Sequence, residues 1–223
     1  MKVLVACEYS GTVRDAFIAA GHDATSCDFL PTDKPGPHYQ GNVLDIVHKP
    51  WDLMIAHPSC TFLCSSGLHW NKKRPERQQQ TEEALDFVRL LLGLPIPKIA
   101  LENPIGCIGT QIRPASQIIQ PWQYGEDASK ATCLWLKGLP LLKPTEVVPA
   151  RFGCKCGHTF NLDLGALGCP KCGGVSGKAK SVWGNQTASG QNKLGPSPDR
   201  WKLRSTTYKG IAEAFANQWG KEI

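Results

Sequence analysis

The chain has 223 residues, and its 25 lysines and arginines against 19 aspartates and glutamates give a formal net charge of +6. Hydrophobic residues make up 41% of the chain, which allows a sizeable core, and no apolar run reaches the roughly 18 residues of a membrane helix. The charge mildly favours a polyanionic partner. Polar Glu8 interrupts the first apolar run, so MKVLVACEYSG is expected to be a strand and not a signal peptide. We therefore expect a cytoplasmic protein with no membrane partner.

Apolar runs alternate with helical patterns along much of the chain. KVLVAC is a continuous apolar, β-branched run, as expected of a strand buried on both faces. Gly21 ends the first helical pattern, and PTDKPGPHYQG (31–41) is expected to be a loop. The order of elements predicts an α/β protein with a mostly parallel sheet. The expected strands are 2–7, 22–28, 52–57 and 98–103, and the expected helices are 13–20, 77–94 and 207–220.

Polar residues follow the carboxyl end of each expected strand. They are residues 8–11, Asp28, residues 58–60 and residues 102–104. Ligands of open α/β sheets bind beyond the carboxyl ends of the strands, so we expect these groups to converge on one cleft. A free cysteine is more often a buried apolar residue than a nucleophile, and this convergence favours a catalytic Cys60. The cysteines interpreted as core residues are Cys7, Cys27, Cys64, Cys107 and Cys133.

The order and spacing of these segments resemble the DNA (cytosine-5) methyltransferase family, in particular its short phage and prophage members. The match runs over most of residues 2–135 and resumes in the last helix. The resemblance implies a Rossmann-like S-adenosylmethionine-dependent methyltransferase fold, and the cytoplasm of a bacterial host if a phage encodes the chain. It assigns binding of S-adenosylmethionine to Tyr9, Ser10, Gly11, Asp28, Asn42, Val43 and Pro58.

Asp28 ends the second expected strand, and Asn42 follows the expected loop at 31–41. Asp28 is expected to bind the ribose hydroxyls, and the alternative that it only caps the next turn stays open. Asn42 stands where the resemblance leads us to expect an aspartate, in GNVLDI (41–46). The turn after the first strand has a single glycine, Gly11, where the family usually has more, so the cofactor must pack differently there.

The segment HPSC (57–60) resembles the nucleophile loop of the family, and LEN (101–103) resembles its Glu-Asn-Val motif. Ser59 replaces the second proline of that loop. The resemblance implies that the Cys60 thiolate adds to C6 of cytosine, and covalent addition of this kind splits one difficult step into two. A thiol with a pKa of about 8.5 is mostly protonated at neutral pH, so the site must help ionise it.

The other catalytic residues implied by the resemblance are Glu102, which would protonate N3 of the base, and Asn103, which would orient the loop. The apolar segment KIAL before Glu102 is expected to raise its pKa toward neutrality. His57 is interpreted as a hydrogen-bond partner of the backbone.

The expected substrate is double-stranded DNA, and a base inside a duplex must be flipped out to reach such a cleft, at a cost of a few kcal/mol. Phe62 and Trp70 are candidate stacking residues in the segment after the nucleophile loop. The alternative, that GLHWNKKRPER is a solvated basic turn, stays open. No Gln-x-Arg-x-Arg motif is present, and Arg113 and Lys130 are candidate substitutes. The candidate nucleic-acid-binding residues are Lys72, Lys73, Arg74, Arg113 and Lys130.

The strongest single motif is a C-x-C-x12-C-x2-C pattern, formed by Cys154, Cys156, Cys169 and Cys172. Two pairs of cysteines separated by a hairpin-length segment are typical of a tetrahedral, structural Zn²⁺ site. The clustering also argues against a disulfide framework and for a reducing compartment, although the chain has ten cysteines. His158 is a weaker candidate ligand than the four thiols.

The predicted domains are a methyltransferase domain of residues 1–145 plus 204–223 and an insert of residues 146–203, a zinc ribbon with an irregular segment. The insert occupies the position of the family's target-recognition region. We expect a DNA cytosine-C5 methyltransferase. Two alternatives stay open: an enzyme of the same fold that modifies a free pyrimidine nucleotide or RNA or uses a modified methyl donor, and a catalytically inactive nucleic-acid-binding relative. The sequence does not predict the oligomeric state.

Overall fold

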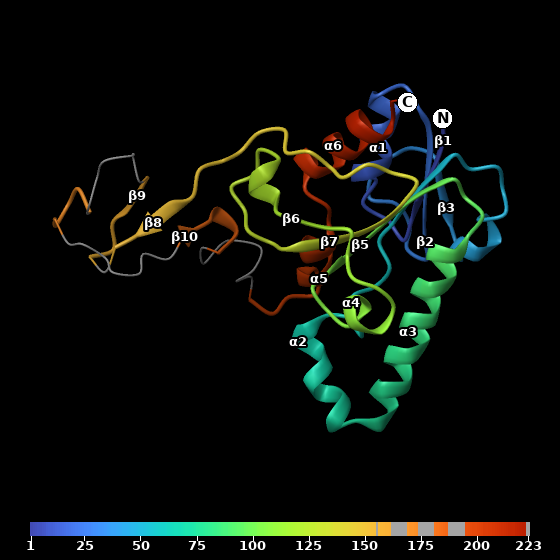
Figure 1. The fold of residues 1–223 in the computed structure, drawn as a ribbon, viewed down its shortest axis with the longest axis horizontal. Coiled ribbons are helices and arrows are strands. Elements are labelled where there is room, and N and C mark those ends of the chain that lie inside the picture. The colour runs from blue at the N-terminus through green and yellow to red at the C-terminus, as the bar shows by residue number, and fades with distance from the viewer. Residues whose placement is uncertain (155, 162–168, 174–180, 187–194, 222–223) are drawn as a thin grey trace. The chain divides into compact units, whose positions relative to one another are not determined.

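The computed structural model describes residues 1–154, 156–161, 169–173, 181–186 and 195–221 (Figure 1). The chain divides into two compact units. The first unit comprises Met1–Ile119, Lys130–Lys143 and Thr207–Ile223, and the second comprises Gln120–Ser129 and Pro144–Thr206. Compared with the predicted insert of residues 146–203, the second unit also includes residues 120–129, 144–145 and 204–206.

A seven-stranded sheet forms the centre of the first unit, in the order β3-β2-β1-β4-β5-β7-β6. Neighbouring strands are parallel from β3 to β5, and β7 runs antiparallel to both β5 and β6. The chain order therefore reverses beside β1, which is where open α/β sheets bind ligands. The strands are β1 Lys2–Ala6, β2 Asp23–Asp28, β3 His38–Gln40, β4 Leu53–Ala56, β5 Lys98–Pro104, β6 Gln117–Ile119 and β7 Thr132–Lys137.

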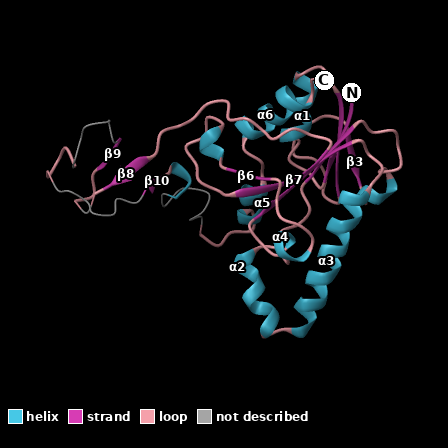
Figure 2. Ribbon diagram, in the orientation of Figure 1, coloured by secondary structure: helices cyan, strands magenta, loops and turns pink. Residues whose placement is uncertain are grey.

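Helices cover both faces of this sheet. Helices α1 and α6 lie side by side, as Figure 2 shows, and each buries a phenylalanine, Phe17 and Phe215. Leu4 of β1 clusters with Leu85 and Val88 of α3 on the other face, because successive strand side chains alternate between faces. The helices of the first unit are α1 Thr12–Ala19, α2 Ser65–Leu68, α3 Pro75–Gly93, α4 Ile108–Gln111 and α6 Lys209–Trp219, with 3-10 helices at Val43–Asp45 and His69–Lys72.

The predicted fold class is confirmed: a mostly parallel, Rossmann-like sheet is flanked by helices. The predicted loop at 31–41 contains the short strand β3, which pairs with β2 and has no apolar run to reveal it. Strands β6 and β7 were not predicted. Helix α3 begins two residues before the predicted start, because Pro75 occupies its first turn. A proline is well suited to this position, since the first N–H groups of a helix have no acceptor within the helix.

The second unit contains a three-stranded antiparallel sheet in the order β10-β8-β9. Of the segment predicted to be irregular, residues 174–180 and 187–194 lie outside the described residues. Its described parts include a strand and the start of a helix. The elements are β8 Arg151–Gly153, β9 Thr159–Asn161, β10 Ser181–Val182 and α5 Arg200–Ser205, with 3-10 helices at Pro121–Gln123 and Gly184–Gln186.

Across the described part of the chain, every helix is too short or too polar to cross a membrane.

Candidate functional site

Cys60 lies in a tight turn beyond the carboxyl end of β4. Pro58 is buried, while Ser59 and Cys60 are exposed. The backbone N–H groups of Leu63 and Cys64 both donate to the Cys60 carbonyl, at 3.1 and 3.0 Å, which closes the turn. Cys60 is therefore an exposed residue on a closed turn at a strand end. Cys64, predicted to be a core residue, is half-buried.

The end of β5 holds this turn in place. The side chain of Asn103 is 1% exposed, and its Nδ2 donates to the Pro58 carbonyl at 2.8 Å. The Cys107 N–H donates to the Leu63 carbonyl at 2.9 Å. A Cβ at Gly106 would lie 1.9 Å from that same carbonyl oxygen, so the two segments can approach only because Gly106 has no side chain. Asn103 thus joins β5 to the loop through this hydrogen bond.

Helix α3 holds the loop from its other side. The Arg77 guanidinium donates to the carbonyls of Thr61 and Gly67, at 2.6 and 3.3 Å, and lies 4.8 Å from the centre of the Phe62 ring. The Thr81 hydroxyl donates to the Phe62 carbonyl at 3.1 Å. Arg77 is therefore occupied with loop carbonyls, a role that its position in a basic run did not reveal.

Glu102 and His57 form a largely buried pair at the edge of the sheet. His57 Nδ1 lies 3.0 Å from Glu102 Oε2, and the side chains are 12% and 18% exposed. Burial acts to raise the pKa of Glu102, but the hydrogen bond from His57 and the charge of Lys130 lower it below its ordinary value. Two expectations were therefore wrong: the pKa of Glu102 is not raised, and the imidazole of His57 bonds a carboxylate and not a backbone group.

The protonation of Cys60 follows from the same neighbours. Burial raises the pKa of the thiol, and Cys64 and Glu102 raise it further, whereas Lys130 lowers it. Lys130 precedes β7, whose antiparallel course brings its first residues next to Pro104 at the end of β5. The cation is therefore close enough to act on both Cys60 and Glu102, which the sequence position alone could not show.

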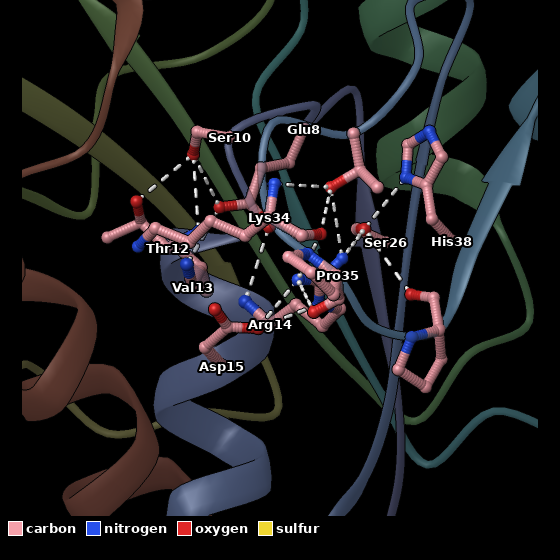
Figure 3. Close-up of polar contacts among 12 residues, drawn as sticks. Glu8, Ser10, Thr12, Val13, Arg14, Asp15, Ser26, Lys34, Pro35 and His38 are labelled. Atoms are coloured by element: carbon pink, nitrogen blue, oxygen red, sulfur yellow. Dashed lines mark hydrogen bonds and ion pairs between the residues drawn. The ribbon is translucent and has the colours of Figure 1, made fainter.

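The turn after β1 is organised by the carboxylate of Glu8, which is 5% exposed (Figure 3). It accepts the backbone N–H groups of Val13 at 2.7 Å and Arg14 at 3.2 Å, and the Ser10 hydroxyl at 3.0 Å. A carboxylate at a helix N-terminus satisfies free N–H donors and interacts favourably with the helix dipole. Glu8 therefore caps α1 and shapes the turn that contains the cofactor candidates Tyr9, Ser10 and Gly11.

Arg14 joins this turn to the loop after β2, although the sequence did not mark it as a site residue. Its side chain is fully buried, and Figure 3 shows the guanidinium surrounded by acceptors. A Cβ at Gly11, where φ is +69°, would lie 2.5 Å from Arg14 Nη2, so this glycine is needed for both conformation and space. The acceptors are Asp15 Oδ1, Ser26 Oγ, Thr32 Oγ1 and the carbonyls of Lys34 and Pro35, at 2.8 to 3.3 Å.

The remaining cofactor candidates lie at the carboxyl ends of β2 and β3. Asp28 Oδ1 accepts the Leu30 N–H at 3.0 Å, and Asn42 Oδ1 accepts the Leu44 N–H at 3.0 Å. Both side chains therefore cap turns, as one alternative held for Asp28. A carboxylate accepts several hydrogen bonds, so the cap leaves Asp28 able to accept ribose hydroxyls. Half-buried Asp28 and Asn42 beside the Glu8 turn are a donor and acceptor set that fits a nucleoside.

The basic segment after the nucleophile loop forms α2, the 3-10 helix His69–Lys72 and the start of α3. Trp70 is 42% exposed, and Lys73 Nζ and Arg74 Cζ lie 5.3 and 5.4 Å from its ring centre. Lys72 is also exposed. An exposed aromatic ring flanked by cations is suited to stacking and to phosphate binding, so this segment is more than a featureless charged turn.

The two candidate substitutes for the missing arginine motif lie apart. Arg113 donates to the Leu136 carbonyl at 3.0 Å, near the carboxyl end of β7. Lys130 precedes the opposite end of that strand, and only Lys130 acts on Cys60 and Glu102. Because β7 is antiparallel to β5, Arg113 lies toward the amino edge of β5 and not at the candidate site.

In the second unit, the thiols of Cys154, Cys156, Cys169 and Cys172 all lie within 4.8 Å of one another. Cys154 Sγ and Cys172 Sγ are 3.5 Å apart, and Cys156 Sγ and Cys169 Sγ are 3.7 Å apart. Four converging thiols fit a tetrahedral Zn²⁺ site, in which the metal would hold the two cysteine pairs together. The ring of His158 stacks on Phe160 and is not part of the cluster.

No protein-family model and no curated protein matches the chain. Among solved structures, it is similar to an E. coli protein described as a DNA modification methyltransferase encoded within a prophage, at 16% identity and a TM-score of 0.43. It is also similar to a mutant of DNMT2 from Spodoptera frugiperda, at 17% identity and a TM-score of 0.39. The matches cover 67% and 66% of this chain but only 52% and 54% of those proteins, so the chain spans about half of their length.

Proposed function

We propose that the protein transfers a methyl group from S-adenosylmethionine to C5 of cytosine in DNA, with Cys60 as the nucleophile. The observation that carries this proposal is the junction of β4 and β5. There, the Asn103 side chain binds the Pro58 carbonyl. Glu102, the preceding residue, acts electrostatically on the Cys60 thiol. A nucleophile and an acid–base group at one strand edge, on a loop held by hydrogen bonds, are the arrangement that covalent catalysis requires.

The proposed chemistry begins with the Cys60 thiolate, whose sulfur forms a bond to C6 of the base. The electron pair of the C5–C6 double bond shifts to form a C4–C5 double bond, the pair of the C4–N3 double bond moves onto N3, and protonation of N3 by Glu102 neutralises the charge there. C5 is then nucleophilic enough to take the methyl group. The sulfonium of S-adenosylmethionine supplies that methyl group when the cofactor is bound. A water molecule then takes the C5 proton, the electron pair of the C5–H bond re-forms the C5–C6 double bond, and Cys60 leaves C6 as the thiolate.

The cofactor would be held by the turn at Tyr9, Ser10 and Gly11 and by the polar groups that follow β2 and β3. Asp28 would accept the ribose hydroxyls and Asn42 would contact the adenine ring, with Val43 beneath it. Pro58 would close the pocket from the nucleophile loop. The fixed geometry of the Glu8 and Arg14 contacts supports this role, since a cofactor binds best to a preformed turn.

The proposed DNA contacts are made by Trp70, Lys72, Lys73 and Arg74, with Lys130 close to the flipped base. The cations can bind the phosphates, and the aromatic ring can stack on a base or on the unpaired partner base. Both contacts offset the cost of flipping. Arg113 is left out of this surface because its side chain binds the Leu136 carbonyl, near the carboxyl end of β7 and away from Lys130. The four-cysteine unit occupies the position of a target-recognition region and is proposed to bind structural zinc.

A non-catalytic nucleic-acid-binding protein is the second candidate, and the protonation of the free site favours it. The pKa of Cys60 is raised and that of Glu102 is lowered, so the free protein holds a thiol and a carboxylate, the reverse of what the reaction uses. The first candidate therefore requires that substrate binding redistributes these protons.

Duplex DNA that contains 5-fluorocytosine, incubated with protein and S-adenosylmethionine, separates the two candidates. We expect a covalent adduct, because fluorine at C5 cannot leave as a proton and the sulfur bond to C6 persists. Denaturing gels and peptide mass spectrometry would locate it on Cys60. Cys60→Ser should form no adduct, while Cys64→Ser, which removes a half-buried thiol four residues later, should form it. No adduct and no protected cytosines on bisulfite sequencing with the wild-type protein would refute catalysis.

The zinc site predicts one equivalent of zinc per chain, because four thiolates complete a tetrahedral shell. Elemental analysis of the purified protein would measure it. Cys169→Ser should lose the metal, and Cys64→Ser should keep it. Retention of a full equivalent by Cys169→Ser would contradict a site built on these four thiols.

A further inference from the structure

His57 has no role in the motifs that mark the site, yet it is the residue in closest polar contact with Glu102. Its Nδ1 donates to Glu102 Oε2 at 3.0 Å, and the contact joins the loop after β4 to β5, 45 positions apart in sequence. Both side chains are largely buried. A histidine that donates one ring N–H to a buried carboxylate is fixed in orientation and tautomer, which gives the second nitrogen, Nε2, a defined position.

The proposed chemistry needs a proton that Glu102 by itself does not hold. The pKa of this carboxyl is lowered although burial acts to raise it, because His57 and Lys130 stabilise the ionised form. Glu102 is therefore a carboxylate at neutral pH. A carboxylate cannot protonate N3 of a base, so the proton must reach it from a neighbour at the moment of addition.

The groups around Glu102 narrow the source of that proton. Lys130, before β7, is a cation that stabilises the ionised form of Glu102 and so does not favour its protonation. The Cys133 thiol on β7 has its pKa raised by burial and by Glu102. On the loop, Cys60 must itself lose its proton to become a nucleophile, and the thiol of its neighbour Cys64 contacts the Ser66 hydroxyl at 3.2 Å. Imidazole is the side chain that gains and loses a proton near neutrality.

We propose that His57 and Glu102 act as one acid, in which the imidazolium of His57 supplies, through Glu102, the proton that N3 of the base receives. The inference rests on the proposed function. As the sulfur bond to C6 forms, one proton moves from His57 Nδ1 to Glu102 and one from Glu102 to N3. The pair loses one proton in total, and His57 becomes neutral. When the thiolate leaves C6, N3 returns its proton and the pair is restored.

The surroundings of His57 Nε2 indicate in which state of the protein the His57–Glu102 pair takes up its extra proton. His57 Nε2 is buried and has no hydrogen-bond partner within the described part of the chain. An imidazolium carries an N–H at this nitrogen, and a buried N–H without an acceptor is costly. The substrate must therefore bring the acceptor, so the pair is protonated in the complex and not in the free protein. This is the redistribution of protons that catalysis at this site requires.

The test is the pH dependence of single-turnover methyl transfer in His57→Asn. Asparagine keeps an N–H that can reach Glu102 but cannot carry an extra proton. For the wild type, the rate should rise with pH as Cys60 ionises and then fall about tenfold per unit as the pair loses its proton. His57→Asn should be about 100-fold slower near neutral pH and should lack the falling limb. His48→Asn, which removes an exposed histidine, should match the wild type.

A purely structural His57 would leave the falling limb in place in His57→Asn, and that result would overturn the proposal. So would a wild-type profile without a falling limb. A second measurement does not depend on activity: ¹⁵N NMR of His57 should show its titration midpoint drop in Glu102→Gln, and an unchanged midpoint would refute the pair. If the wild type methylates no cytosine at any pH, the proposed function fails, whereas the NMR result still decides whether the two groups titrate together.

Discussion

The two halves of the candidate site differ in how completely their polar groups are paired. Around the ends of β1 and β2, Glu8 and Arg14 are buried and their polar atoms meet several partners each. Around the ends of β4 and β5, Cys60 is exposed, and Asn103 Oδ1 and His57 Nε2 are buried without partners in the described residues. Buried polar groups are normally satisfied, so unpaired ones are a candidate place for a ligand. The first half is a fully paired scaffold, whereas the second leaves polar atoms open for the substrate that the proposed function requires.

The largest expected effect tests the scaffold half. Arg14→Met should lower the free energy of unfolding by about 3–5 kcal/mol, because it leaves buried acceptors of the turn and loop unpaired. Urea unfolding would measure it. Arg89→Met is the matched control, since Arg89 pairs with Asp86 on the exposed side of α3 and should matter by about 1 kcal/mol or less. Equal losses in the two variants would show that the Arg14 contacts do not stabilise the scaffold.

A smaller effect is expected for the helix cap. Glu8→Gln should cost about 1 kcal/mol, because it removes the charge that faces the N-terminus of α1 while an amide oxygen can still accept one N–H. The same unfolding experiment applies. Glu213→Gln removes an exposed carboxylate that pairs with Lys209 within α6, and it should change stability by a few tenths of a kcal/mol. A loss no larger in Glu8→Gln than in this control would contradict the cap.

The smallest effect tests how neighbouring charges act on the pKa of Cys60, in the half of the candidate site around β4 and β5. Because burial, Cys64 and Glu102 raise the pKa of Cys60, its alkylation by iodoacetamide should quicken with pH up to and beyond pH 9. Lys130 lowers that pKa, so Lys130→Met should slow alkylation at pH 8 by about two- to threefold. Peptide mass spectrometry would follow Cys60 specifically. Lys137→Met, at the far end of β7, should alkylate like the wild type, and slowing in both variants would point to a general charge effect.

The comparison also shows why some site residues were predictable and others were not. Cys60, Asp28 and Glu102 could be selected as candidates because each lies at or just after the point where the apolar run of a strand gives way to polar residues. Arg14 could not, because its acceptors come from a loop 18 to 21 residues later whose path no local pattern determines. One signal did exist: a lone arginine within the apolar spacing of VRDAFIAA needs buried acceptors.

What the sequence determined by itself is local: the periodicity of strands and helices, the glycine that permits a turn, and the spacing of four cysteines. Those features depend on neighbours along the chain. The tertiary structure alone decided that β7 returns antiparallel beside β5, that Lys130 therefore approaches Cys60, and that His57 meets Glu102. The sign of a pKa shift is decided at the same level. Burial and charged partners act in opposite directions, and their balance depends on which groups the fold brings within a few ångströms.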